Sequence, residues 1–304
     1  MKICFPDKET PRDFHILKRR VQLEGDTLTD NPQEADLTFA KNPVSTGVCL
    51  RPISSLPTVL AQSFGFDVEK QDTGELLIFG KFYSRGAFSE QTIVGIPLAG
   101  CLSGGQGKPV SSGTCSNYMH SGKLDSLFAE TLFEEYLQES KYTGFVSLGV
   151  RMEQGNLFLQ TVYLGLPNHL LWNALIGCQG RISELFVGLK PVLKESWVVN
   201  LFLCKFPWPN RSEPSSGRTH LSNLTPAVER YFWPFDLKGF NSKSLYTDSD
   251  FIGCATSYHK ELAEASRLAQ RTCKSLGVSS PQFRIDAETV AGAVWYRLKE
   301  TLRG

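Results

Sequence analysis

The chain has 304 residues, of which 41% are hydrophobic and 21% are charged. This composition is ordinary for a globular protein, and the length allows one large domain or two intertwined ones. Lysine and arginine (32 together) nearly cancel aspartate and glutamate (31 together), which leaves a net charge of +1. Such a charge gives no general electrostatic reason to expect nucleic acid or an acidic membrane as a partner, although a local basic groove is compatible with it.

The amino terminus and the cysteines favour a soluble, cytoplasmic protein with no membrane partner. Pro6 and Asp7 interrupt the start of the chain, which excludes the apolar stretch of a signal peptide. No segment approaches the roughly 18 apolar residues that a membrane-spanning helix needs. The eight cysteines are scattered without a Cys-x-x-Cys pair, so we expect buried, reduced thiols and no zinc site.

The first hundred residues predict short strands separated by irregular segments. Strand-like patterns occur at residues 2–5, 37–40, 75–83 and 92–96. From Gly95 to Ser116 the chain is rich in small residues, and we expect a loop there. A loop of that length without secondary structure is often functional.

The middle of the chain predicts a helix, a hairpin and a second helix. Apolar residues at helical spacing indicate the first helix over residues 121–140. Residues 143–151 and 156–164 are predicted strands, and Gln154-Gly155 between them is a hairpin turn signal. Pro167 then starts the second predicted helix.

The last third of the chain predicts strands followed by helices. Residues 197–206 and 250–256 are predicted strands, and aromatic residues between them argue that 207–249 is ordered. Predicted helices cover residues 257–276 and the segment after Asp286, a plausible N-cap. The pattern is that of a mixed α+β protein with hairpins, and a doubly wound Rossmann sheet is the weaker interpretation.

The most informative motif is a glycine-rich segment. Successive glycines let backbone N–H groups turn toward one point, which makes a concave anion site, and they let a ligand approach the backbone closely. A glycine-rich surface turn is the alternative, because the segment lacks the Gly-Lys-Ser/Thr ending of a Walker loop. The candidates for binding a substrate phosphate are Ser103, Gly104, Gly105, Gln106 and Gly107.

Further motifs follow this segment along the chain. Tyr142-Thr143-Gly144-Phe145 precedes the hairpin, Gly165-Leu166-Pro167 opens a helix, and Leu262-Ala263-Glu264-Ala265 and Phe283-Arg284-Ile285-Asp286 lie near the end. In this order they resemble the phosphoribosylamine–glycine ligase family of ATP-grasp enzymes, over roughly residues 60–189 and 250–298. That family has a TGGMG loop for the substrate phosphate, a Y-x-G strand and a glycine–acid–proline element at its nucleotide–metal site, and a YRxDIG stretch near its end.

The resemblance implies a fold of ATP-grasp-like antiparallel sheets with flanking helices, a reduced N-terminal domain and lid, and a small C-terminal α/β subdomain. It implies ATP as a cofactor. Lys41, followed by Gly47-Val48, is similar to the family's lid lysine, with a solvated loop lysine as the alternative. The positions that correspond to nucleotide-binding elements of the family are Lys41, Tyr142, Gly144, Gly165 and Pro167. Arg284 and Asp286 correspond to the C-terminal subdomain motif, and a purely structural pair across a helix start is the alternative.

The chain departs from the family where the metal should bind. The family carries Glu and Asn before its glycine–acid–proline element, whereas this chain has Leu159, Thr161 and Tyr163 in the corresponding region. Mg²⁺ needs anionic oxygen ligands, which these residue types do not supply, so Mg²⁺ is doubtful. Leu98 also stands where the family has an Asp for the substrate amine.

Other candidate residues have ordinary explanations. The five histidines show no metal-ligand spacing, and no Gly-x-Ser-x-Gly elbow marks a nucleophile. Aromatic residues between Tyr231 and Phe240 offer a surface on which bases stack, but packing over a sheet is the favoured interpretation.

We expect four regions: a reduced N-terminal and lid region (1–60), an ATP-grasp-like core (61–206), an aromatic and proline-rich insertion (207–249) and a C-terminal subdomain (250–304). The leading hypothesis is a carboxylate–amine ligase-like protein that binds a small phosphorylated ligand. Its shortened chain resembles bacteriophage relatives, in which the fold serves nucleotide or base modification. The alternative is a non-catalytic protein that binds a nucleotide or sugar phosphate and has lost the metal site.

Overall fold

The computed structural model describes two compact units, and each is treated by itself. The first unit contains residues 1–95, 117–194 and 296–304, and the second contains residues 96–116 and 195–295. The described residues are 2–4, 25, 27–29, 37–38, 75–100, 110–129, 137–139, 142–166, 168–181, 184, 189–206, 218–234, 238, 245–248 and 251–303.

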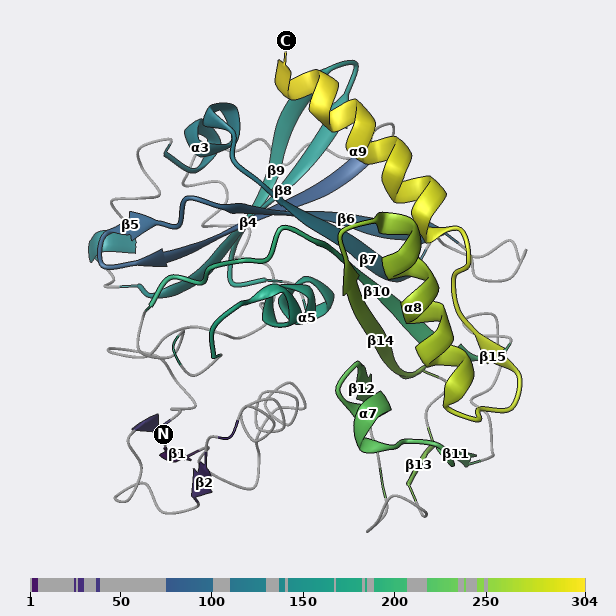
Figure 1. Cartoon of the computed structure of the whole chain (residues 1–304). Coiled ribbons are helices and arrows are strands. Elements are labelled where there is room, and N and C mark those ends of the chain that lie inside the picture. Colours follow the sequence, from purple (N-terminus) through teal and green to yellow (C-terminus); the bar gives the residue numbers. More distant parts are fainter. Residues whose placement is uncertain are drawn as a thin grey trace. The chain divides into compact units, whose positions relative to one another are not determined.

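An antiparallel sheet forms the framework of the first unit (Figure 1). Its strands in hydrogen-bonded order are β6 (Thr92–Gly100), β4 (Glu75–Ser84), β8 (Gly144–Glu153) and β9 (Asn156–Leu164), with β5 (Ala87–Phe88) paired to β4. β4 and β8 are paired from Glu75 opposite Met152 to Tyr83 opposite Gly144. Both faces of β4 are buried beyond its first two residues, which explains its nearly continuous hydrophobic sequence.

Two helices accompany this sheet, α3 (Gly122–Ala129) and α5 (Asn168–Gly177). Leu124 and Phe128 are the buried residues of α3. From Leu170 to Gly177 every residue of α5 is buried, which fits its apolar sequence on all sides. A separate small parallel sheet has the order β2 (Thr27–Thr29), β1 (Lys2–Cys4), β3 (Leu37–Thr38).

The second unit also contains an antiparallel sheet. Its order is β12 (Phe232–Pro234), β14 (Phe251–His259), β10 (Trp197–Lys205) and β7 (Val110–Met119), with β15 (Pro281–Gln282) paired to β10. A short helix and a two-stranded sheet complete the unit: α7 (Pro226–Glu229), β11 (Thr219–His220) and β13 (Tyr246–Thr247). β6 and β7 each run from one unit into the other.

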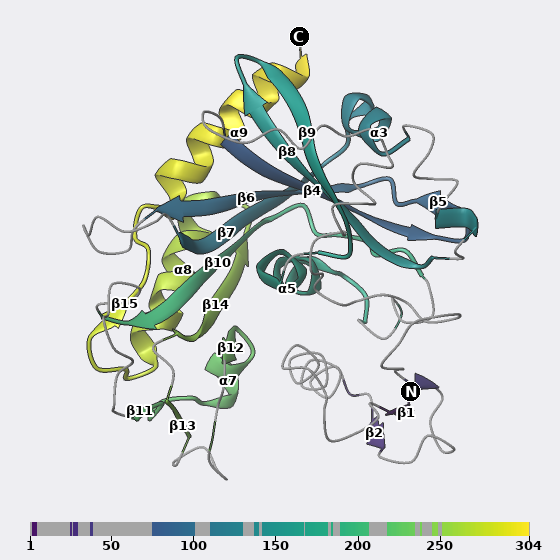
Figure 2. The same ribbon diagram turned by 180° about the vertical axis from the view of Figure 1, so that it is seen from behind.

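Two amphipathic helices end the chain, α8 (Leu262–Ser275) and α9 (Ala287–Arg303). α8 contacts β10 and β14, and in Figure 2 it lies beside these strands. Its small buried residues Ala265 and Ala269 let it lie close to the sheet, and Ser257 of β14 donates a hydrogen bond to the Ala265 carbonyl. In the second unit, the early part of α9 contributes Trp295, whose ring centroid lies 5.0 Å from that of Trp197.

The sequence-based prediction of an α+β fold with antiparallel sheets is confirmed. The hairpin strands agree closely with β8 and β9, and Gln154 and Gly155 form the turn with φ values of 49° and 77°. The described part of the helix expected over 121–140 begins at Gly122, and the helix expected after Asp286 is α9.

Two predicted boundaries are wrong. The loop expected from Gly95 to Ser116 is strand at both described ends, because β6 continues to Gly100 and β7 begins at Val110. The sequence of β7 is rich in Ser, Gly, Thr and Asn, so its strand character arises from pairing with β10 and not from propensity. The helix expected from Ser257 begins only at Leu262, because Ser257, Tyr258 and His259 continue β14 opposite β10.

Burial supports two further interpretations of the sequence. Phe232 and Trp233 are fully buried, so these members of the aromatic segment pack in the core and do not offer a stacking surface. Five described cysteines are buried thiols, namely Cys115, Cys178, Cys204, Cys254 and Cys273. Within the described residues, every helix is too short or too polar to cross a bilayer.

Replacing Gly113 with alanine is expected to lower the free energy of unfolding by at least about 2 kcal/mol. Gly113 has φ +141°, and a Cβ atom there would collide with the Asn200 backbone carbonyl on β10. Urea unfolding measures the change. Gly122→Ala is the matched control, because nothing lies within 4 Å of its added Cβ and alanine favours the helix that begins there. Equal effects of the two substitutions would contradict this account.

Candidate functional site

Arg284 and Asp286 form an ion pair in the second unit, and Arg284 also contacts a third residue, Ser112, that the sequence did not single out. Arg284 Nε donates to Asp286 Oδ1 at 2.6 Å, and Nη2 donates to Oδ2 at 3.3 Å. The same guanidinium donates through Nη1 to Ser112 Oγ at 3.3 Å. Ser112 in turn donates to the Leu98 carbonyl at 2.7 Å, which joins β7 to β6.

The Arg284 guanidinium therefore lies beside β7, which together with β6 flanks the glycine-rich segment. The segment leaves β6 after Gly100 and enters β7 at Val110, so Leu98 and Ser112 stand just outside its two ends. The Arg284 side chain is only 15% exposed, and a partly buried guanidinium acts more strongly on an anion than one in bulk water. Ser103, Gly104, Gly105, Gln106 and Gly107 themselves lie outside the described residues.

The charge of Asp286 is stabilised by its partner. The hydrogen bond from Arg284 holds the pKa of the Asp286 carboxyl below its ordinary value of 3.8. α9 begins at the next residue, and Val290 N donates to the Asp286 carbonyl at 3.2 Å. Asp286 therefore links the cation to the start of a helix, as the sequence interpretation of a pair across a helix start expected. Burial raises the pKa of the nearby Cys115 thiol, so this cysteine is no ready nucleophile.

A second group of predicted residues meets in the first unit, at one end of the β8–β9 hairpin. Tyr142 Oη donates to the Phe145 carbonyl at 2.5 Å, and Gly144 begins β8. Ser147 donates to the Gly165 carbonyl at 2.7 Å, which ties the end of β9 to the start of β8. Gly144 (φ 150°) and Gly165 (φ 123°) have backbone conformations that favour glycine.

The remaining predicted nucleotide-binding residues, Lys41 and Pro167, lie outside the described residues. In β9, Leu159 is paired with Val150, Thr161 with Gly149 and Tyr163 with Ser147. A register shift between the first two of these pairs breaks the simple alternation that counting along the sequence assumes. Among the described residues, no three His, Cys, Asp or Glu side chains gather as a metal site.

Lys81 is a buried cation that the sequence analysis overlooked. Its ammonium lies 2.5 Å from Asp125 Oδ1, 3.0 Å from the Ser89 carbonyl and 3.4 Å from the Glu90 carbonyl. An ammonium group has three N–H donors, so these three oxygens satisfy it. The signal in the sequence that could have identified Lys81 is a charged residue inside the apolar run of β4. In the structure, Lys81 holds the first turn of α3 against the β4–β5 hairpin.

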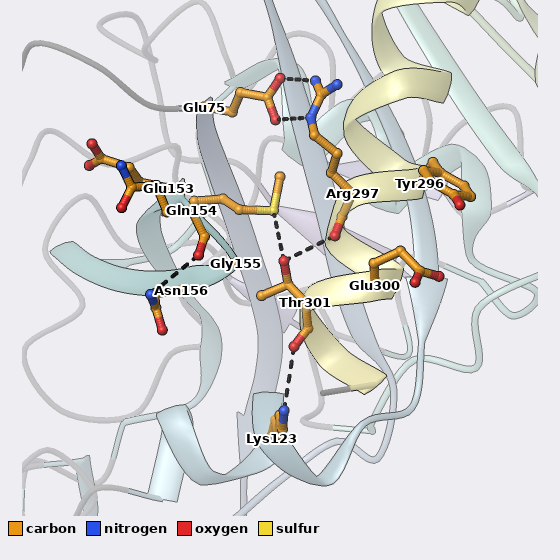
Figure 3. Close-up of a pocket in the computed structure, with 11 residues that line it drawn as sticks. Glu75, Lys123, Glu153, Gln154, Gly155, Asn156, Tyr296, Arg297, Glu300 and Thr301 are labelled. Atoms are coloured by element: carbon orange, nitrogen blue, oxygen red, sulfur yellow. Dashed lines mark hydrogen bonds and ion pairs between the residues drawn. The ribbon is translucent and has the colours of Figure 1, made fainter.

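The first unit also has an open pocket of about 800 Å³ at the turn end of the β8–β9 hairpin (Figure 3). Its walls come from the start of β4, the hairpin turn, Lys123 and the last turns of α9. Arg297 pairs with Glu75, Lys123 donates to the Thr301 carbonyl, and Thr301 contacts Met152 Sδ. These contacts attach α9 to the sheet. No predicted site residue lines the pocket, which lies at the other end of the hairpin from Gly144 and Gly165.

Comparison with known proteins finds solved structures that are similar to this one. No family model matches the sequence, and no curated protein matches it. The solved structure of phosphoribosylamine–glycine ligase from Thermotoga maritima is similar, with a TM-score of 0.52 and 16% identity over 70% of this chain and 56% of that one. The fold is that of the ATP-grasp ligases.

Two other ATP-grasp structures are similar at lower scores. Phosphoribosylglycinamide synthetase from Anaerococcus prevotii has a TM-score of 0.45 and 9% identity over 69% of this chain and 54% of that one. L-amino acid ligase from Bacillus licheniformis has a TM-score of 0.47 and 9% identity over 91% of this chain and 98% of that one. The chain thus spans 56% and 54% of the first two ligases, and at 16% identity the likeness concerns the fold.

Asp286→Asn is expected to lower stability in a pH-dependent way. Because the folded pKa of Asp286 lies below 3.8, the pair's contribution is complete above that pH and disappears as the pH falls through the folded value. We expect a loss below about 1 kcal/mol at neutral pH, since the carboxylate is largely exposed, and a smaller difference from the wild type at about pH 2. Asparagine keeps N-cap ability, so the cap is not the cause. Urea unfolding at both pH values tests this, and a pH-independent difference would contradict it.

Proposed function

We propose that this protein is an ATP-grasp-type, carboxylate–amine ligase-like protein that binds a phosphate or phosphoribosyl group at Ser103–Gly107. The observation that carries the proposal is the Arg284 guanidinium bound to Ser112, at the foot of the strand into which that segment leads. Arg284 and Ser112, 172 residues apart in the sequence, thereby form one polar neighbourhood in the second unit, on the strand that follows the glycine-rich segment.

The chemistry of this neighbourhood suits a phosphate. Glycine-rich backbone amides and a guanidinium are two donor types that proteins use for phosphate oxygens. Asp286 already holds the guanidinium at two nitrogens, so an arriving phosphate competes with a carboxylate. A ligand with two negative charges has the advantage in that competition over one with a single charge.

We assign the nucleotide to Tyr142, Gly144, Gly165 and Pro167 at the end of the β8–β9 hairpin, with Lys41 as a phosphate contact. The described contacts of Tyr142 and Ser147 support this assignment, because they fix the two strand ends that would face ATP. A ligase of this kind joins a carboxylate to an amine through an acyl phosphate. The residue types at Leu159, Thr161 and Tyr163 do not fit Mg²⁺, because they supply no carboxylate oxygen to hold it.

Those neutral residues favour a second candidate function. A protein that keeps the fold and the anion segment but lacks metal carboxylates would bind a nucleotide or sugar phosphate without turning it over. For the ligase function, the biological context that we propose is nucleotide or base modification in a bacteriophage.

A ligand panel separates the two functions. We expect ribose 5-phosphate, ATP or ADP to raise the melting temperature, because a ligand that binds only the folded state stabilises it. Stabilisation by ATP only when Mg²⁺ is present supports the ligase. Stabilisation by the sugar phosphate without metal supports the binding protein. No shift with any of the three ligands, with or without Mg²⁺, would refute both.

Two variants test the assignment of the phosphate. Gly105→Val is expected to abolish the phosphate-dependent shift while the fold remains, because a branched side chain fills the anion cradle. Arg284→Gln is expected to raise the Kd for ribose 5-phosphate about 10- to 100-fold, the cost of one charge-assisted hydrogen bond. The melting temperature with and without ligand measures the effect of Gly105→Val, and isothermal titration measures the Kd of Arg284→Gln.

The control for the second variant is Arg267→Gln, which removes an exposed guanidinium that pairs with Glu264 on α8. It changes the net charge equally and should leave the affinity unchanged. Equal losses in the two variants would mean that overall charge, and not the position of Arg284, decides binding.

A further inference from the structure

Strand β9 forms the edge of the first unit's sheet. In the hydrogen-bonded order of that unit β9 comes last, and among the described strands it is paired only with β8. Figures 1 and 2 both show the two strands side by side. An edge strand presents backbone N–H and C=O groups that another extended strand can pair with.

The sequence of this edge lacks the usual protection against such pairing. Proteins guard exposed edges with charged residues, proline, short strands or bulges. β9 is nine residues long, NLFLQTVYL, and contains no charged residue and no proline. The register shift beyond Leu159 is the one device present, and it leaves the segment Asn156–Leu159 regularly paired with β8.

The sequence around Phe158 is self-complementary. Asn156-Leu157-Phe158-Leu159-Gln160 reads amide, Leu, Phe, Leu, amide in either direction. Within the regularly paired part, antiparallel pairing centred on Phe158 sets Phe opposite Phe and Leu157 opposite Leu159. No like charges meet, and matched apolar or aromatic cross-strand pairs are favourable.

The side chains of this segment are available for such pairing. Phe158 is 43% exposed, and the Arg151 guanidinium lies 5.4 Å from the centre of its ring. Leu157 and Leu159 are both half-buried. Leu76 of β4 is exposed and, through Arg151, belongs to the same cross-strand row as Phe158. The edge thus joins open backbone groups to a partly exposed apolar row.

We propose that β9 pairs antiparallel with β9 of a second copy of this chain, about a two-fold axis at Phe158. The palindromic segment selects a second copy over an unrelated peptide, because a two-fold interface requires a surface complementary to itself. The two sheets become one continuous sheet. So short a stretch of strand pairing buries less area than a standard interface, so the dimer is weak and depends on concentration.

Sedimentation equilibrium with the full chain tests the proposal. We expect dimerisation over a range of about 1 to 100 μM, and Phe158→Lys should raise the dimer Kd at least about tenfold by setting two ammonium groups opposite each other. Leu76→Lys is the matched control, because it makes the same change on the same row two strands inside the edge. A monomer at every concentration, or equal effects of the two variants, would overturn the proposal.

Cross-linking tests the register and does not depend on how Phe158→Lys folds. Residues directly opposite each other in an antiparallel pair have Cβ atoms about 4.5–5.5 Å apart, close to disulfide range. Phe158→Cys should therefore give a disulfide-linked dimer under mild oxidation, whereas Leu76→Cys and the wild type should not. Linkage through all three proteins, or through none, would exclude pairing centred on Phe158.

Discussion

Antiparallel strand pairing decides which residues of this protein can meet at a site. β8 is held on both sides, by β4 and by β9, and this places Gly144 and Gly165 at the same end of one hairpin. In the second unit β7 is paired with β10, and Gly113 is required where the two backbones come closest. Each candidate group lies at or near the end of such a ladder, where the chain leaves the sheet.

This chain shares its fold with the ATP-grasp ligases at low sequence identity. The sheets with flanking helices keep the ATP-grasp fold, as the likeness to a ligase at 16% identity shows. In β9, Leu159, Thr161 and Tyr163 are neutral, and the described acidic residues Glu75, Glu153 and Glu300 line a pocket at the turn end of the hairpin. A fold is maintained by apolar burial and backbone pairing, both of which tolerate exchange of a few polar residues.

Some of the polar groups buried in this fold are satisfied by specific partners. Lys81 is surrounded by three oxygens, and in the second unit Asn200 and Trp233 both donate to Thr256 Oγ1. An unpaired polar group at such positions would cost more than the hydrogen bond contributes, so these networks fix one arrangement of the core. Arg284 differs, because its partner Asp286 is exposed and a ligand can reach the pair.

The sequence by itself determined the hairpin of β8 and β9, the helices α5 and α9, and the pairing of Arg284 with Asp286, because these depend on periodicity, turn residues and near neighbours. Only the tertiary structure decided that Val110–Met119 is a strand, that β14 continues to His259, and that Ser112 accepts a hydrogen bond from Arg284. In those cases the stabilising partner is distant along the chain. The polar sequence of β7 becomes a strand because β10 supplies its backbone hydrogen bonds, a contribution that no local pattern encodes.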